Sequence, residues 1–416
     1  MKQTSVTSKK LKNRWLIAFS GILIHLSIGS AYAWSIFTNP IQKSSSWSES
    51  QISFAFSLAI FCLGFSAAFM GHLTDKHGPR MTGTISAIFF GSGIALTGLA
   101  ISLHSLPMLY LSYGLIGGIG LGTGYVTPVS TMMAWFPDRP GLATGMAIMG
   151  FGFATLITTP IAEALMASVG ISNTFYILGA SYFVIILLSA QYMEKPPVGW
   201  APEGFKAEKK ETVKASIAGP TITANEALKT KRFWMLWFML FINITCGIAL
   251  ISAAAPLAEK STGMTAVMAA TMVAIMGLFN GGGRFLWATV SDYIGRPNVF
   301  TTFFIVDVIA LVLLYFTTSP VIFFILICLL MTCYGGGFSS VPIYISDMFG
   351  DKVVASIHGY ILTAWALAGM TGPLLLSWIT DKTGTYATAM LVFAGLSAVA
   401  LVLSLAIRRE NAKYSA

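Results

Sequence analysis

The feature of this sequence that most constrains its fold is a series of long apolar runs separated by short polar turns. A helix needs about 20 residues to cross the roughly 30 Å hydrocarbon core of a bilayer. Only 10% of the 416 residues are charged, against about 25% in soluble domains. We therefore expect an all-α membrane protein with twelve transmembrane helices. The predicted helices span 14–38, 50–72, 81–102, 107–135, 141–168, 173–193, 233–258, 264–290, 298–317, 320–349, 353–380 and 385–407.

The twelve predicted helices fall into two sets of six, separated by a polar, charged stretch. This division predicts an N-terminal six-helix bundle over 1–193, a linker over 194–232 and a C-terminal six-helix bundle over 233–416. The halves also repeat, because the loop GHLTDKHGPR (71–80) after the second predicted helix returns as ATVSDYIGRP (288–297) after the eighth. Two pseudo-symmetric halves predict a binding site between them at mid-membrane, reached by alternating access.

The distribution of lysine and arginine predicts how the chain is oriented. Of the 25 lysines and arginines, only Lys43, Lys260 and Lys382 fall in loops on the side opposite the termini. Because cytoplasmic loops carry the excess of these residues, both termini and the linker are expected in the cytoplasm. The net charge of +9 is then an orientation signal, and a nucleic-acid surface is not expected. The four cysteines show no metal-like spacing, so neither a metal site nor a disulfide is expected.

Several motifs resemble those of a known family. The Gly-x-Leu-x-Asp-x-x-Gly-x-Arg loop at 71–80, its copy at 288–297 and the sequence Asp138-Arg139-x-Gly141 are similar to the major facilitator superfamily. Four stretches resemble its oxalate/formate antiporter family, which includes bacterial lactate- and pyruvate-type transporters: AYAWSIFTNP (31–40), GYVTP (124–128), WFPDRPGLATG (135–145) and FNGGGRFLW (279–287). The resemblance implies a secondary transporter of the bacterial cytoplasmic (inner) membrane. Its gating loops would contain Asp75, Arg80, Asp138, Arg139, Asp292 and Arg296.

An arginine stands inside the eighth apolar run, in the sequence GLFNGGGRFLW (277–287). Arg284 precedes the loop residue Asp292 by about 12 Å of helix, which places it near the bilayer midplane. A charge there is expected to face an aqueous cavity or a partner, and a guanidinium binds a carboxylate through two parallel hydrogen bonds. The alternative is a structural ion pair with Asp307 in the ninth helix. The resemblance implies that Arg284 is the ligand of the substrate carboxylate.

Departures from the family pattern refine this expectation. Asn280, one helical turn before Arg284, stands where animal monocarboxylate transporters have an aspartate. Trp365 in the eleventh helix stands where the oxalate exchanger has a lysine, which leaves one midplane cation and favours a monocarboxylate. His358 lies on nearly the same face as Trp365. It is a candidate for a conditional second charge, or else a histidine that meets water at the helix end.

Aromatic residues on other helices are candidates for the wall of the site. Tyr32, Tyr125 and Tyr334 each combine an apolar ring with a hydroxyl that can reach a substrate oxygen. Packing is the alternative role for each of them. Phe151 and Phe338 align with tyrosines of the oxalate exchanger, so the resemblance implies a less polar cavity.

Three residues are candidates for proton coupling. His25 shares a helix face with Tyr32 and can titrate near neutral pH, the alternative being a neutral histidine bonded to a neighbouring helix. His358 is the second candidate. Asp307 is the third, although a buried carboxyl, partnered or protonated, is the role we favour for it.

Together these features predict a secondary transporter that carries a small monocarboxylate such as L-lactate or pyruvate with a proton. We expect a monomer in the lipid bilayer, without a cofactor, and no enzyme, since no nucleophile–base pair or nucleotide loop stands out. Two alternatives stay open. One is an oxalate:formate-type exchanger, and the other is a transporter-like sensor that binds a carboxylate without moving it.

Overall fold

The computed structural model describes residues 11–197, 200–202 and 222–413, and within them every regular element is helical. The predicted linker over 194–232 therefore lies mostly outside the described residues. The last part of the linker, from residue 222 on, carries one short helix, α10 (Ala224–Ala227).

The first half consists of six membrane-crossing segments. They are α1 (Arg14–Gly29) continuing through η1 (Ser30–Ala33) into α2 (Ser35–Ser44), α3 (Glu49–His77), α4 (Pro79–Ser102), α5 (Leu106–Leu109) continuing through η2 (Tyr110–Gly117) into α6 (Gly118–Trp135), α7 (Pro140–Val169) and α8 (Ile171–Tyr192).

The second half repeats this pattern. Its segments are α11 (Lys231–Thr262), α12 (Ala266–Ile294), α13 (Arg296–Phe316), α14 (Pro320–Phe349), η3 (Asp351–Val353) followed by α15 (Val354–Ile361) and α16 (Thr363–Thr383), and α17 (Tyr386–Ala412).

Eleven of the described segments are long and apolar enough to cross a bilayer. The remaining long helix, α12, has 29 residues, and its first part, up to Phe279, is apolar. The predicted all-α fold of twelve transmembrane helices in two six-helix halves is confirmed.

The pseudo-symmetry is visible in the backbone of the repeated loops. Gly78 and Gly295 occupy equivalent positions and both have positive φ, 85° and 82°. Each ends one helix and starts the next, a conformation that glycine adopts without strain. These two residues give the loops at 71–80 and 288–297 the same sharp reversal.

The helices differ from the prediction where they break. Near Ser30 the first helix tightens into 3-10 form, and the Ser30 hydroxyl donates to Ser27 O at 2.7 Å, a back-bond that bends helices. The predicted helix 353–380 breaks at Leu362, where Trp365 N donates to Leu362 O at 2.9 Å.

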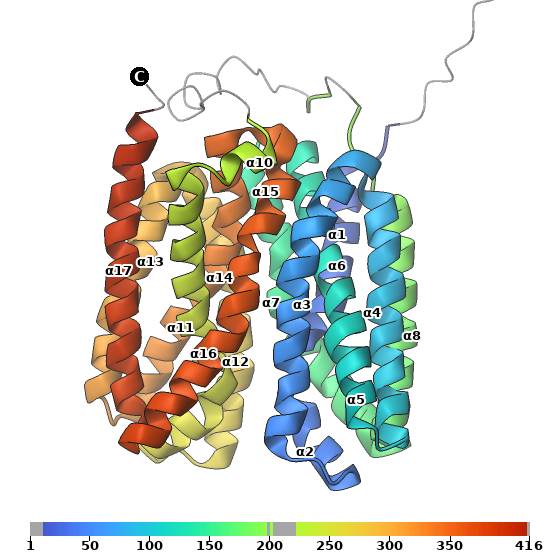
Figure 1. Ribbon diagram of the computed structural model, residues 1–416, viewed down its shortest axis with the longest axis vertical. Coiled ribbons are helices and arrows are strands. Elements are labelled where there is room, and N and C mark those ends of the chain that lie inside the picture. Colours follow the sequence, from blue (N-terminus) through green and yellow to red (C-terminus); the bar gives the residue numbers. More distant parts are fainter. Residues whose placement is uncertain (1–10, 198–199, 203–221, 414–416) are drawn as a thin grey trace, which may run out of the picture.

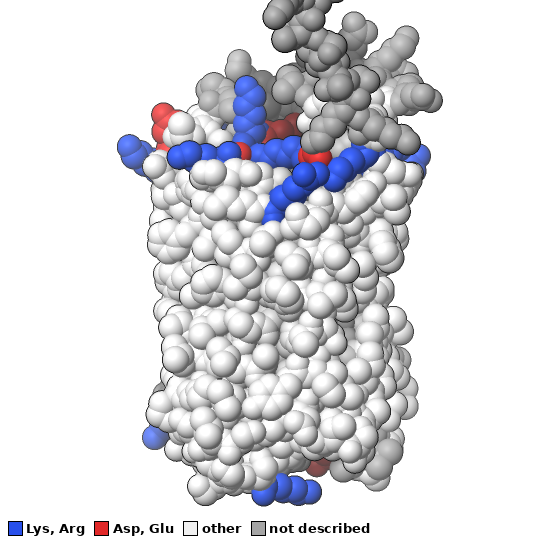
Figure 2. Space-filling model, turned by 90° about the vertical axis from the view of Figure 1, so that its right-hand side faces the viewer, with Lys and Arg blue, Asp and Glu red and all other residues white. Residues whose placement is uncertain are grey.

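The two halves stand side by side, with α1–α8 in blue to green and α11–α17 in yellow to red (Figure 1). They meet along two seams, where α3 packs against α15 and α16, and α7 packs against α12 and α14. Helix α10, α15 and the end of α17 lie at one end of the molecule, which we call the linker end. Lysine and arginine side chains form a belt there and are sparse at the opposite end of the visible face (Figure 2).

The seam between α3 and α15 depends on close backbone approach. A Cβ added to Gly359 would lie 2.2 Å from Ala67 O, so only glycine fits while the halves are closed at the linker end.

We predict that Gly359→Val separates the halves at the linker end. Spin labels at positions 76 and 352, where both native lysines are exposed, should report a longer distance than in the otherwise native protein. The matched control is Gly395→Val, since a Cβ there meets nothing within 4 Å. An unchanged distance in Gly359→Val would contradict this account of the seam.

Candidate functional site

Arg284 lies near the centre of α12 and is fully buried, with 0% of its surface exposed. Asn280, one turn earlier, accepts a hydrogen bond from its Nε at 3.2 Å. The i, i+4 spacing along the helix brings these two side chains together. Asn280 therefore orients the guanidinium from its own helix.

The other edge of the guanidinium lies near the hydroxyls of Tyr32 and Tyr125 and pairs with no carboxylate among the described residues. Neither Nη1 nor Nη2 of Arg284 makes a hydrogen bond with the described residues, although both are buried. Arg284 and Asp307 form no ion pair within the described residues. The alternative role of Arg284, a structural ion pair with Asp307, is therefore not seen in this structure. A buried charge without a partner is costly, and two free N–H groups in one plane match the two oxygens of a carboxylate.

Two phenyl rings flank the guanidinium, one from each half. The Cζ atom of Arg284 lies 5.2 Å from the ring centre of Phe151 on α7 and 4.8 Å from that of Phe338 on α14. Cation–π contacts of this kind stabilise a cation without neutralising it. They leave the in-plane edge with Nη1 and Nη2 available to a ligand.

The three predicted tyrosines gather around this arginine. Tyr32 on η1 and Tyr334 on α14 share a hydrogen bond between their hydroxyls at 2.9 Å, which links the two halves. Tyr125 on α6 is fully buried, and its hydroxyl has no partner within the described residues. The Tyr32 and Tyr125 hydroxyls also lie within electrostatic reach of Arg284.

Trp365 on α16 completes the group of aromatic rings around Arg284. Its ring centre lies 4.5 Å from that of Phe338, 5.2 Å from that of Tyr125 and 5.5 Å from that of Phe151. The indole is fully buried, and its Nε1 makes no hydrogen bond with the described residues. Trp365 therefore closes the aromatic wall and leaves one unused donor.

Two imidazoles border this wall. His25 on α1 stacks on Tyr125 with ring centres 5.0 Å apart, and its Nε2 lies 3.0 Å from Tyr125 O. A carbonyl only accepts, so Nε2 carries the proton in this contact. The ring centre of His358 on α15 lies 5.9 Å from that of Tyr125, and the side chain is buried. His358 is therefore not a histidine that meets water at the end of its helix.

Asp307 is separated from this group. It is buried on α13 and lies within electrostatic reach of Cys246 on α11 and Cys333 on α14. The structure thus assembles the predicted residues of helices 1, 4, 5, 8, 10 and 11 but not the carboxyl of helix 9.

The predicted gating loops hold the linker end of the molecule closed. Asp75 at the end of α3 accepts hydrogen bonds from Ser356 N at 3.1 Å and Ser356 Oγ at 2.6 Å, in the first turn of α15. Asp292 at the end of α12 accepts from Gly141 N at 3.1 Å, in the first turn of α7. Each aspartate therefore binds a helix N-terminus of the opposite half, where negative charge is favoured.

The predicted arginines act within their own halves. Arg296 donates to Asp292 at 2.6 Å and pairs with Asp347 at 3.3 Å. Arg80 donates to Glu194 at 2.7 Å and to Met193 O at 3.2 Å. Arg296 therefore holds Asp292 in place, and Arg80 ties the first gating loop to the start of the linker.

Asp138 and Arg139, the other predicted gating residues, lie between α6 and α7. Asp138 pairs with Arg14 at 3.1 Å, which ties the start of α1 to this loop. Arg139 is the exposed N-cap residue of α7.

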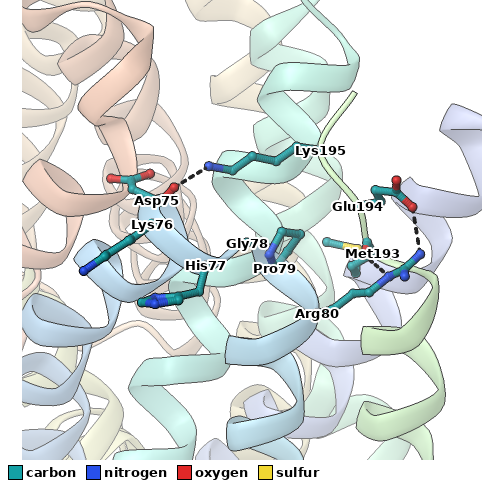
Figure 3. Close-up of a pocket in the computed structure, with 9 residues that line it drawn as sticks. All are labelled: Asp75, Lys76, His77, Gly78, Pro79, Arg80, Met193, Glu194 and Lys195. Atoms are coloured by element: carbon teal, nitrogen blue, oxygen red, sulfur yellow. Dashed lines mark hydrogen bonds and ion pairs between the residues drawn. The ribbon is translucent and has the colours of Figure 1, made fainter. Parts of the chain in front are cut away.

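A cavity of about 410 Å³ opens beside the first gating loop, lined by 75–80 and 193–195. Figure 3 shows Lys195 reaching over it to donate to Asp75 O, at 3.0 Å. The start of the linker is thus bonded to the gating loop, a contact that the sequence did not predict.

Sequence reasoning also missed the residues that donate to the gating aspartates. The stretch DKVVASIHG (351–359) loosely resembles DRPGLATG (138–145), and this similarity is the signal that could have pointed to the segment that contains Ser356. A bridge from His72 through Tyr360 to Asn225 had no such signal. The Tyr360 hydroxyl donates to Asn225 Oδ1 at 2.9 Å and lies 3.2 Å from His72 Nε2.

We predict that Arg284→Met raises the melting temperature of the purified protein without substrate. The variant removes a buried charge whose cost in a bilayer begins at about 2.5 kcal/mol. Arg408→Met is the contrast, because Arg408 donates to Pro297 O at 3.1 Å and its loss should lower the melting temperature. A lower melting temperature in Arg284→Met would mean that the guanidinium is already satisfied.

Comparisons with known proteins identify the family of the chain. The chain matches the Major Facilitator Superfamily over residues 17–369 and 245–416. It is 29% identical to an oxalate:formate antiporter of Oxalobacter formigenes, over 97% of this chain and 93% of that protein. It is 24% identical to monocarboxylate transporter 10 of Mus musculus, over 80% of this chain and 65% of that protein.

A solved structure shares the fold. The fucose:proton symporter FucP of E. coli superposes with a TM-score of 0.69 at 14% identity, covering 94% of this chain and 98% of that one. These relatives are transporters, and the chain is not an enzyme. The chain belongs to the Major Facilitator Superfamily.

Proposed function

We propose that this protein is a secondary active transporter of a small monocarboxylate of the L-lactate or pyruvate type, coupled to a proton. Arg284 would bind the carboxylate between the halves. In this proposal the protein works as a monomer in the bacterial cytoplasmic membrane with both termini inside. Its moving units are 1–193 and 233–416, joined by the linker 194–232.

The observation that carries the proposal is the unpartnered edge of Arg284. Its Nη1 and Nη2 are buried and pair with no carboxylate among the described residues. Asn280 accepts from Nε, and the uncharged hydroxyls of Tyr32 and Tyr125 lie near the other edge. A bidentate carboxylate supplies both the missing charge and the missing acceptors. Relatives named as an oxalate:formate antiporter, a pyruvate carrier and monocarboxylate transporters support a small carboxylate.

The preference for one carboxylate over two rests on the walls of the site. The described side chains that gather around Arg284 include no further lysine or arginine; they are His25, Tyr32, Tyr125, Phe151, Asn280, Tyr334, Phe338, His358 and Trp365. A second carboxylate facing these rings would lose its hydration without gaining a cation. A methyl group would find ordinary apolar contact there.

Coupling follows from the charge balance. Without substrate the site holds one buried cation, and with a monocarboxylate the pair is neutral and crosses the barrier between the two open states more easily. The proton enters with the acid or on His25 or His358, whose rings border Tyr125. Opening at the linker end requires Asp75 to leave Ser356 and Asp292 to leave Gly141.

One observation favours exchange of oxalate for formate as a second candidate. His358 is buried 5.9 Å from Tyr125, and its protonated form would supply the second cation that a dicarboxylate needs. Exchange without dependence on a pH gradient would support this function.

The direct test is uptake of radiolabelled L-lactate into proteoliposomes, with and without an inward pH gradient. We expect gradient-driven uptake that falls about 100-fold or more in Arg284→Ala, the cost of losing one partner of a buried charge pair. Arg409→Ala, at an exposed arginine of α17, should retain it. Oxalate–formate exchange without L-lactate uptake would support the second candidate, and binding without any flux would indicate a sensor.

Trp365→Lys tests what selects one carboxylate. A lysine in the aromatic wall should make oxalate a competitor at least about tenfold stronger and should weaken L-lactate uptake, because a second cation prefers a second carboxylate. Trp365→Gln removes the ring without adding charge and should not strengthen oxalate. Equal oxalate competition in the native protein and Trp365→Lys would show that position 365 does not set selectivity.

A further inference from the structure

A second cavity lies at the linker end, remote from Arg284, between the first turns of α11 and the later part of α17. It has a volume of about 280 Å³. Its rim carries Lys229 and Lys231, and its floor is formed by Trp234 and Phe238 of α11 with Leu403 of α17. A cationic rim above an apolar floor is the feature that requires explanation.

The two lysines are available for a ligand. Both side chains are exposed, and neither ammonium group makes a hydrogen bond or an ion pair with the described residues. The carboxylates that act on them electrostatically are engaged elsewhere. Glu226 accepts from Thr223 N at 2.7 Å, and Glu410 accepts from Lys413 Nζ at 2.7 Å.

The backbone that carries Lys229 is held in place. Lys229 N donates to Glu226 O at 3.0 Å, and the Trp234 indole donates to Leu228 O at 2.9 Å. The Thr230 hydroxyl donates to Ala227 O at 2.8 Å and accepts from Phe233 N at 3.2 Å. The rim is therefore preorganised around the start of α11.

The floor leads from the rim toward the interior of the membrane. Trp234 and Phe238 are one helical turn apart, 45% and 46% exposed, within a segment that is long and apolar enough to cross a bilayer. Their ring centres are 6.4 Å apart. Tryptophan is enriched at the level of lipid headgroups, and Phe238 lies one turn deeper.

We propose that this cavity binds an anionic phospholipid of the leaflet at the linker end. Its phosphate lies between Lys229 and Lys231, and one acyl chain lies along Trp234, Phe238 and Leu403. Basic pockets at the ends of membrane helices bind anionic headgroups in this way. A free phosphate ion would use the lysines and leave the apolar floor unexplained, whereas a lipid uses both.

The test compares lipid binding by purified protein in detergent, using native mass spectrometry with added phosphatidylglycerol or phosphatidylcholine. We expect one phosphatidylglycerol to bind saturably and phosphatidylcholine not to displace it. In the double variant Lys229→Gln/Lys231→Gln this affinity should fall roughly thirtyfold, as two surface lysines near a membrane contribute. Lys43→Gln/Lys382→Gln, which removes the same charge at the opposite end, should bind as the native protein does.

A second measurement locates the acyl chain. Phosphatidylglycerol with brominated acyl chains should quench less of the total tryptophan fluorescence in Trp234→Phe than in the native protein. Equal loss of binding in both lysine pairs would overturn the site, and so would equal binding of the two lipids. Competition by millimolar inorganic phosphate that abolishes lipid binding would also overturn it, in favour of a phosphate site.

Discussion

The structure is organised around one unpaired charge. Arg284 sits at the centre of a helix, fully buried, with one of its three nitrogens bonded to Asn280 and the other two unbonded among the described residues. The protein tolerates this charge by surrounding its faces with the rings of Phe151 and Phe338, not by neutralising it. Because the two rings come from opposite halves, the arginine is also a point at which the halves contact each other.

The remaining contacts between the halves are suited to breaking and reforming. At the linker end they are hydrogen bonds from Asp75 and Asp292 to the first turns of α15 and α7, and water can replace each of these partners. Beside the arginine the halves share one hydrogen bond, between the hydroxyls of Tyr32 and Tyr334. Trp365 of the second half also packs there against the rings of Tyr125 and Phe151. Exchangeable hydrogen bonds at the linker end allow the halves to separate there and rock as units.

The fold was predictable because a bilayer leaves so few alternatives. A segment that crosses hydrocarbon must satisfy its own backbone, so each apolar run had to be a helix. The predicted grouping of Arg284 with the tyrosines and Trp365 depended on the family resemblance as well as on the repeat. The structure brings these side chains together, and their roles in binding stay a prediction.

What the sequence did not reveal depends on register between distant segments. Ser356 faces Asp75 only because Gly359 lets α15 approach α3 closely, and periodicity carries no information on that approach. The break at Leu362 and the bridge from Tyr360 to Asn225 likewise depend on how distant segments pack against one another. Asp307 is a further example. Its position in the middle of an apolar run does not show which neighbours it has, and in the structure these are Cys246 and Cys333, not Arg284.

The most direct test of the central claim is a distance between Arg284 and bound substrate. Solid-state nuclear magnetic resonance on protein with ¹⁵N-labelled arginine and carboxyl-¹³C L-lactate would measure it, with Arg284→Lys identifying the signal. A bidentate pair predicts strong dipolar coupling to both Nη atoms, at carbon–nitrogen distances of about 3–4 Å, and its disappearance in Arg284→Lys. Bound lactate without coupling to any arginine, or with coupling that persists in the variant, would contradict the account.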